Sequence, residues 1–268
     1  MAFRFHKMHG LGNDFVVLDA RAQAVALDGA RARALADRRT GIGCDQVILI
    51  GPGKDSDVTM RIWNADGSEV SACGNATRCV PVLIGRAVTI RTAAGLLHAA
   101  PDSEGASVDM GAPRFDWDAI PLAYAMDTAR LPTAWGVLQN PAAVNIGNPH
   151  LVFFVDDAHA VPLDTLGPEI ENDPLFPERI NVNIATLQGR DHAVMRTWER
   201  GAGLTRACGT GACAVFAAGR RAGLLDATVR LDLPGGRLTL SEGADGHLLM
   251  RGPATHVFTG EAEWEAFG

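Results

Sequence analysis

An internal repeat constrains the fold of this chain more than any other sequence feature. Residues 60–74 read MRIWNADGSEVSACG and residues 195–209 read MRTWERGAGLTRACG, so one offset of 135 residues aligns the two segments without a gap. Self-similarity of this kind predicts a chain built from structurally equivalent parts, here two halves. The identical positions are Met60, Arg61, Trp63, Ala72, Cys73 and Gly74 in the first copy and Met195, Arg196, Trp198, Ala207, Cys208 and Gly209 in the second.

Each copy predicts a strand, a loop and a helix in that order. The runs DVTMRIWN and HAVMRTWE alternate apolar and polar residues, as a half-buried strand does. A glycine-containing loop follows each run, and the apolar, small-residue segments 76–84 and 211–222 are then typical of buried helices. Each repeated cysteine is therefore expected where a loop turns into the N-terminus of a helix.

The remaining strand signals define the fold class. The runs FVVLD, DQVILI, AVTIRT, HLVFFV, ATVRLDL, GRLTL and GHLLM are mostly closed by Gly or Pro turns. Because strands outnumber helices and their connections are short, we predict an α+β fold with mostly antiparallel sheets. We expect residues 1–116 plus about 255–268 to form the half that carries Cys73, and residues 117–254 the half that carries Cys208.

Charge and cysteine usage exclude several kinds of function. The chain has 31 acidic and 24 basic residues, a net charge of −7, and no dense basic stripe, so we expect no nucleic-acid partner. It lacks both a signal-like start and a run of about 20 apolar residues, so we expect a cytoplasmic protein without membrane contact. Five cysteines at spacings unlike those of zinc ligands argue against disulfides and against a metal site.

The two repeated cysteines are the candidate catalytic residues. A thiol at a helix N-terminus has its pKa lowered from about 8.5 toward neutrality by the helix dipole. The first backbone N–H groups of such a helix also bind anions, so Gly74 and Asn75 in one half, and Gly209 and Thr210 in the other, are candidate donors to a substrate carboxylate.

Two such thiols on opposite faces of a substrate could invert a stereocentre. One sulfur removes the proton as a thiolate while the other, as a thiol, returns one. The usual cofactor for amino-acid racemisation, pyridoxal phosphate, needs a lysine. The chain has only Lys7 and Lys54, and Lys54 lies in the turn-like segment GPGKDSD. We therefore predict a small-molecule substrate and an amino-acid epimerase that uses no cofactor.

Two other functions stay open from the residues alone. A redox pair would use one thiol to attack and the other to resolve, although the chain has no C-x-x-C segment. A ligand-binding protein without catalytic activity would hold the substrate but would not exchange its α-proton. The other cysteines, Cys44, Cys79 and Cys213, have the ordinary interpretation of small core residues.

Six ordered segments carry a resemblance to a known family. They are MHGLGNDFVVLD (8–19), GIGCDQ (41–46), NADGSEVSACGNATRC (64–79), GNPH (147–150), RINVNIA (179–185) and ERGAGLTRACGTGACA (199–214). Over nearly its whole length the chain resembles diaminopimelate epimerases. The resemblance implies two pseudo-symmetric halves, each a mostly antiparallel sheet wrapped around a central helix, with the active site in the cleft between them. It also implies a cofactor-independent interconversion of LL- and meso-diaminopimelate on the route to lysine and peptidoglycan.

The resemblance also implies roles for individual residues. Cys73 and Cys208 would be the two acid/base residues, and His150 and Glu199 would support the reacting centre. Amides that donate and accept hydrogen bonds, and a guanidinium that grips a carboxylate, suit a long zwitterion with two amino-acid ends. The expected substrate-binding residues are Asn13, Gln46, Asn64, Gly74, Asn75, Asn148, Asn181, Glu199, Arg200, Gly209 and Thr210.

Three departures and one rival accompany the resemblance. The first cysteine segment reads CGNAT where CGNGA is more usual, RINVNIA ends in Ala, and Leu204 replaces an acidic residue. Proline racemase-like and hydroxyproline epimerase-like enzymes share the fold and the cysteine pair, but their substrates have one amino-acid end. The sequence does not fix the oligomeric state, for which a homodimer is our expectation.

Overall fold

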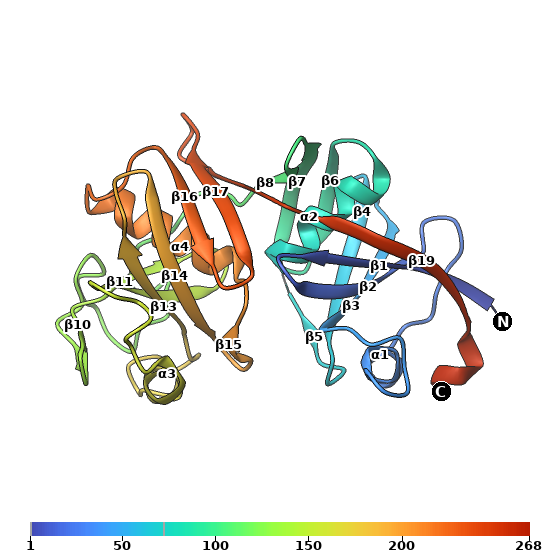
Figure 1. Cartoon of the computed structure of the whole chain (residues 1–268), viewed down its shortest axis with the longest axis horizontal. Helices are drawn as coiled ribbons and strands as arrows, with labels where there is room; N and C mark the ends of the chain where they lie inside the picture. Colours follow the sequence, from blue (N-terminus) through green and yellow to red (C-terminus); the bar gives the residue numbers. More distant parts are fainter. Residues whose placement is uncertain (1, 72) are drawn as a thin grey trace. The chain divides into compact units, whose positions relative to one another are not determined.

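The computed structural model describes residues 2–71 and 73–268 (Figure 1). The chain divides into two compact units, the first formed by Met1–Val108 with Gly252–Gly268 and the second by Asp109–Arg251. The halves expected from the sequence, with boundaries near residues 116 and 254, remain a prediction. In the described part of the chain, no helix is both long enough and apolar enough to span a membrane.

The first unit is a sheet curved around one helix. Helix α2 (Gly74–Ile84) packs against β1, β7 and β19, and α1 (Gly29–Ala36) covers β3 and β4 on another side. The pairs β2–β3 and β4–β6 are parallel, whereas β1–β2, β1–β19, β3–β4, β4–β5 and β6–β7 are antiparallel. The strands are β1 (Ala2–Gly10), β2 (Asn13–Asp19), β3 (Gln46–Pro52), β4 (Val58–Asn64), β5 (Glu69–Val70), β6 (Val88–Thr92), β7 (Gly95–Asp102), β8 (Gly105–Asp109) and β19 (Thr255–Glu263), and a 3₁₀ turn, η1 (Trp264–Phe267), follows the last.

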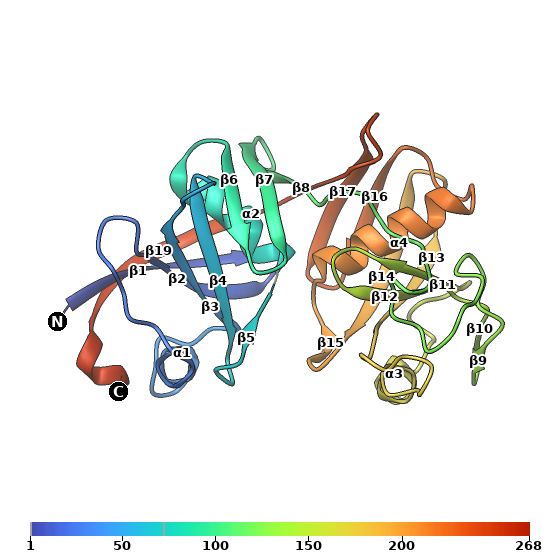
Figure 2. The same ribbon diagram turned by 180° about the vertical axis from the view of Figure 1, so that it is seen from behind.

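The second unit repeats this arrangement (Figure 2). Helix α4 (Gly209–Arg221) packs against β11, β12, β13 and β17, and α3 (Leu163–Glu171) lies on β13, β14 and β15. The pairs β12–β13 and β14–β16 are parallel, and the neighbouring pairs are antiparallel. The strands are β9 (Ala134–Trp135), β10 (Leu138–Gln139), β11 (Ala142–Asn145), β12 (Pro149–Phe154), β13 (Asn181–Leu187), β14 (His192–Glu199), β15 (Gly203–Thr205), β16 (Thr228–Leu233), β17 (Gly236–Glu242) and β18 (Leu248–Gly252).

Strand register shows that the two units are equivalent residue by residue. Val47 pairs with Trp63 between β3 and β4, and the residues 135 positions later, Val182 and Trp198, pair between β13 and β14. The parallel pairs obey the same offset, since Phe15 lies opposite Gln46 and His150 lies opposite Asn181. The predicted α+β fold with two pseudo-symmetric halves is confirmed, and the offset provides a residue-level map from one half to the other.

The central helices are buried because sheet surrounds them, and most of their residues are small or apolar. In α4 the buried residues run almost without interruption from Gly209 to Gly219, and in α2 from Gly74 to Pro81. The composition of α4 is that of a helix buried on all sides, whereas α2 also buries the polar residues Asn75, Thr77 and Arg78. Both helices begin two residues before the predicted starts at 76 and 211, so the glycine after each cysteine is already helical.

Candidate active site

Both repeated cysteines are helix N-caps. Cys73 precedes α2 with φ −150° and ψ 109°, and Cys208 precedes α4 with φ −125° and ψ 109°. This extended conformation is the usual one for an N-cap residue, whose side chain then lies beside the first N–H groups of the helix. The prediction that each cysteine lies at a loop-to-helix junction is confirmed.

In the first half, the amide of Asn13 joins the cysteine to the helix. Its Oδ1 accepts from the Cys73 Sγ at 3.8 Å and from the Asn75 Nδ2 at 3.3 Å. The Asn75 amide is fixed in turn, because its Oδ1 accepts at 2.9 Å from the fully buried guanidinium of Arg78. Asn13, Cys73 and Asn75, all expected from the sequence to be site residues, therefore form one hydrogen-bonded group.

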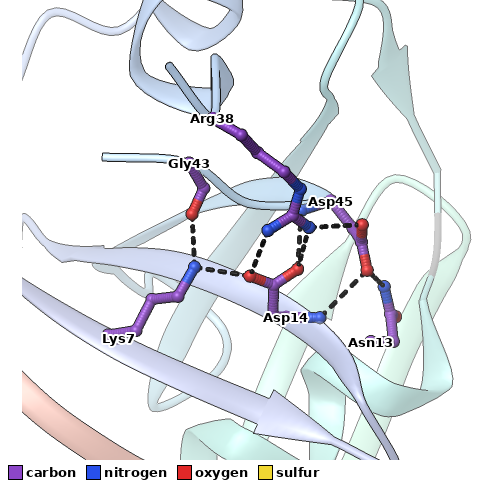
Figure 3. Close-up of polar contacts among 6 residues, drawn as sticks. All are labelled: Lys7, Asn13, Asp14, Arg38, Gly43 and Asp45. Carbon is purple, nitrogen blue, oxygen red and sulfur yellow. Dashed lines mark hydrogen bonds and ion pairs between the residues drawn. The ribbon is translucent and has the colours of Figure 1, made fainter. Parts of the chain in front are cut away.

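A charged cluster fixes the opposite side of the Asn13 amide (Figure 3). Asn13 Nδ2 donates to Asp45 Oδ2 at 3.0 Å, and Arg38 bridges Asp45 and Asp14 at 2.8 and 2.5 Å. Lys7 donates to Asp14 at 2.5 Å and to the Gly43 carbonyl. Although burial raises it, the pKa of Asp14 falls to about 2 because Arg38 and Lys7 donate to the carboxylate. Since Asp45 can only accept, the amide oxygen of Asn13 must face Cys73.

Two further predicted residues of the first half meet across adjacent strands. Gln46 on β3 and Asn64 on β4 are register partners, and Gln46 Nε2 donates to Asn64 Oδ1 at 2.9 Å. Asn64 Nδ2 donates to Ser68 Oγ at 3.2 Å. The pair places side-chain amides at the end of β4, shortly before the loop that leads to Cys73.

In the second half, Cys208 is buried, with 4% of its surface exposed. Its Sγ accepts from the Gly211 backbone N–H at 3.4 Å and lies 3.5 Å from the Thr210 hydroxyl. Burial, together with the Glu199 carboxylate beside it, nevertheless raises the pKa of the Cys208 thiol well above its ordinary value. The expectation that the helix N-terminus lowers this pKa is wrong for Cys208, because desolvation and a neighbouring acid outweigh the two donors.

Glu199 shares this enclosure. It lies at the end of β14, where its Oε1 accepts from the Thr205 hydroxyl at 2.5 Å. Burial raises the pKa of Glu199, while Thr205 and Cys208 oppose that shift by donating to its carboxylate. The thiol and the carboxyl both have raised pKa values and lie in contact, so the pair retains one proton that either group can carry. Glu199 therefore contacts the sulfur that it was expected to support.

A buried imidazole lies behind Thr210. His150 Nε2 is 2.9 Å from Asn148 Oδ1, and Asn148 Nδ2 donates to Thr210 Oγ1 at 3.3 Å. His150 has no exposed surface, and this burial, reinforced by the positive charge of Arg200, lowers its pKa to about 3. The imidazole is therefore neutral at physiological pH, and it orients Asn148 as a neutral hydrogen-bond donor.

The neutral imidazole makes stability depend on pH. The pKa of His150 is about 3 in the folded state and about 6.5 when exposed. Its contribution to the free energy of unfolding is therefore complete above pH 6.5 and is lost as the pH falls toward 3. We expect the free energy of unfolding to fall by about 2 kcal/mol more in the wild type than in His150→Gln between pH 7.5 and 5. Urea titrations at the two pH values measure this difference, and parallel losses in both proteins would contradict it.

The remaining two predicted residues of the second half hold backbone. Asn181 is buried; its Nδ2 donates to the Pro149 carbonyl at 2.8 Å, and its Oδ1 accepts from the Arg200 N–H at 2.9 Å. Arg200 Nη1 donates to the Glu178 carbonyl at 2.7 Å. Asn181 thus ties the segment that carries Asn148 and His150 to the segment that carries Glu199 and Arg200.

Three residues of this half were not predicted as site residues. Asn183 and Thr197 are buried polar side chains that bond to each other at 3.1 Å, and Asn183 also lies 3.2 Å from His150 Nδ1. Gly211 lies against both, because a Cβ there would be 2.5 Å from Asn183 Oδ1. The signal that could have found them is the offset of 135, which maps Asn183 and Thr197 to the apolar Ile48 and Ile62.

Comparison with known proteins identifies relatives of this chain. The family model described as diaminopimelate epimerase matches residues 5–115 and 142–257. A diaminopimelate epimerase of Zymomonas mobilis is 65% identical over 100% of both chains. One of Erythrobacter litoralis is 62% identical over 98% of each chain.

Similarity among solved structures extends to more distant proteins. A probable proline racemase from Agrobacterium radiobacter is 17% identical, with a TM-score of 0.69 over 97% of this chain and 92% of that one. A phenazine biosynthesis protein of the PhzF family from Bacillus anthracis is 15% identical, with a TM-score of 0.68 over 98% and 99% of the two chains. At such low identities, these structures show a shared fold only.

Proposed function

We propose a mechanism from the premise that this chain belongs to the diaminopimelate epimerase family. It is an isomerase that epimerises diaminopimelate, a reaction of lysine biosynthesis, as relatives 50–65% identical over nearly the full chain indicate. The more distant racemase fold relatives are only 16–17% identical, which does not favour proline or hydroxyproline as the substrate. The substrate proposed is 2,6-diaminopimelate, interconverted between its LL and meso forms.

The reaction we propose uses Cys73 and Cys208 as two bases on opposite faces of the substrate α-carbon. One sulfur takes the α-proton and the other gives a proton to the carbanion, so the configuration inverts. In the absence of substrate Cys208 is held as a thiol by burial and by Glu199, which makes it the natural donor. When the reaction runs in the other direction, Glu199 would accept the thiol proton of Cys208, and the resulting thiolate would take the α-proton.

The helix N-termini are proposed to stabilise the carbanion. The first N–H groups of a helix have no carbonyl partner within it and carry partial positive charge. The N–H groups of Gly74 and Asn75 at α2, and of Gly209 and Thr210 at α4, would donate to the carboxylate beside the reacting carbon. Charge that develops as the α-proton leaves is then delocalised onto a carboxylate held by fixed dipoles, so no pyridoxal phosphate or metal is required in this scheme.

The other predicted residues are proposed to recognise the rest of the substrate. The bonded amides of Gln46 and Asn64 offer donors and acceptors for a distal amino-acid end. Asn13 lies next to the Cys73 thiol, and Asn148 bonds to Thr210, which lies beside Cys208. The Arg200 guanidinium would pair with a carboxylate. Asn181 would act by holding the backbone of residues 149 and 200.

The single observation that carries this function is the pair of N-cap cysteines in a chain 65% identical to a diaminopimelate epimerase. The test is incubation of the reduced protein with LL-diaminopimelate in deuterated water, without pyridoxal phosphate or added metal. We expect α-deuteration together with the meso isomer. Exchange with proline or hydroxyproline instead would keep the mechanism and overturn the substrate, and binding without exchange would indicate a ligand-binding protein.

We also infer a cytoplasmic homodimer. Val257 and Phe258 on β19 are 54% and 48% exposed, and exposed apolar side chains on a strand offer a surface for self-association. We further propose that the two halves of the chain are residues 1–116 with 255–268 and residues 117–254. Light scattering after gel filtration gives the mass, and a mass near 28.3 kDa would contradict the dimer.

A further inference from the structure

The interior of the second half differs from that of the first at three matched positions. Phe15, Ile48 and Ile62 are buried in the first half, and the offset of 135 places His150, Asn183 and Thr197 at the same positions of the second. Strand register supports the match, because Ile48 pairs with Ile62 and Asn183 pairs with Thr197. The first half shows that apolar residues satisfy this fold at these positions, so the polar set is not needed for folding.

Hydrogen bonding determines the direction of every proton in this polar set. Asn183 Nδ2 donates to the Leu151 carbonyl at 2.8 Å, and Asn183 Oδ1 accepts from Thr197 Oγ1 at 3.1 Å. The amide orientation is therefore fixed from both ends, and its nitrogen faces His150 Nδ1 at 3.2 Å. Since Nδ1 must accept, a neutral His150 carries its proton on Nε2.

The same constraint continues to the cysteine. His150 Nε2–H donates to Asn148 Oδ1 at 2.9 Å, which turns Asn148 Nδ2 toward Thr210 Oγ1 at 3.3 Å. Thr210 Oγ1 accepts there, so its own proton is directed to Cys208 Sγ at 3.5 Å. From Asn183 to the sulfur, each acceptor leaves only one arrangement for the next donor.

We propose that Asn183 is a positioning residue for the reaction, because it sets the tautomer of His150 and, through Asn148, directs the Thr210 hydroxyl proton at Cys208. This role rests on the proposed function of Cys208 as an acid/base residue. Asn183 itself does not reach Cys208 in the described contacts; it acts through His150. A hydroxyl that donates to the sulfur stabilises the thiolate, so the effect is on how readily Cys208 gives up and regains its proton.

The sharpest test is Asn183→Asp, which keeps size and shape but exchanges the donor for an acceptor. Its carboxylate would bind a proton on His150 Nδ1, leaving Nε2 to accept. The Asn148 amide would then turn over, and Thr210 would donate to Asn148 instead of to the sulfur. We expect alkylation of Cys208 by iodoacetamide to slow about tenfold or more, the effect of losing one hydrogen bond to a charged group. Alkylation of Cys73 should be unchanged.

Tandem mass spectrometry locates the alkylated cysteine, and Thr128→Val is the matched control. Thr128 is also buried, in the same half, but it bonds to the Phe115 carbonyl and to Arg221 at the far end of α4. We expect this variant to leave both alkylation rates unchanged. An unchanged Cys208 rate in Asn183→Asp, or equal changes at both cysteines, would overturn the proposal.

Two further readouts test this inference, and the second of them does not depend on its premise. We expect kcat to fall in Asn183→Asp while KM changes little, since a merely structural defect would move both. If that variant does not fold, ¹⁵N-correlated spectra of the wild-type histidines still decide the matter, with His150 assigned by its absence in His150→Gln. A neutral Nε2–H tautomer supports the proposal, and an Nδ1–H tautomer or a charged ring overturns it. Alkylation and spectra need no substrate, so they stand even if diaminopimelate is not turned over.

Discussion

Replacing either Cys73 or Cys208 with serine is expected to lower the rate of epimerisation by about three orders of magnitude or more. A serine hydroxyl is a far weaker acid than a thiol, so at neutral pH it is not ionised to take the α-proton and is not acidic enough to give a proton to the carbanion. Each half contributes one sulfur from the same N-cap position, and the inversion that we propose needs both. The measurement is α-deuteration and isomer formation in deuterated water for each variant.

The control for these variants is Cys213→Ser. Cys213 is a buried cysteine of α4 that the proposed mechanism does not use. Its replacement is expected to lower the stability of the protein but to change kcat by less than about tenfold. Near-normal turnover in either Cys73→Ser or Cys208→Ser, with the circular dichroism of the wild type, would refute the two-base scheme.

The second large effect is expected from Gly211→Ala. The added Cβ would lie 2.5 Å from Asn183 Oδ1 and 3.1 Å from Thr197 Oγ1, and 3.3 Å from the Cβ of Cys208. The surroundings are buried, so the start of α4 must shift; overpacking of this kind costs about 1–3 kcal/mol of stability. Because Gly211 N–H donates to Cys208, we expect kcat to fall about a hundredfold as well.

A double-mutant cycle identifies the cause of the expected loss of stability. Asn183→Ala removes the oxygen that the new Cβ would meet, so Gly211→Ala should cost less stability in the Asn183→Ala background than in the wild type. Urea unfolding of the four proteins measures the coupling. Additive free energies would show that Asn183 is not the obstacle. The first half provides a natural precedent, since the residue matching Gly211 is Ala76 and the one matching Asn183 is Ile48.

The backbone plan of this protein could be predicted from its sequence because it depends on local signals. The repeat around Cys73 and Cys208, the alternating runs before it and the small-residue segments after it predict two equivalent α+β halves. The structure has these strands and helices where the pattern predicts them, because the spacing of apolar residues along a short segment determines which of its faces can be buried. The exact helix starts at Gly74 and Gly209 were missed by two residues because glycine and asparagine also favour loops.

The interior of the second half could not be predicted in the same way. Asn183 lies in RINVNIA and Thr197 in HAVMRTWE, where single polar residues fit an ordinary half-buried strand. The offset of 135 matches them to the apolar Ile48 and Ile62, but only the fold shows that they bond to each other and that Asn183 contacts His150. The raised pKa of Cys208 was missed for a similar reason, because helix position is visible in a sequence, whereas desolvation by surrounding chain is not.

Pairing of β1 with β19 has a consequence for the order in which the chain can fold during synthesis. The two strands pair from Ala2 with Glu263 to His9 with Thr255, although the whole second unit lies between them in the chain (Figure 1). On the ribosome the second unit has all of its residues before β19 is translated. The unit that is begun first is therefore the last whose sheet can be completed, and until then β1 keeps an unpaired edge that invites association with other strands.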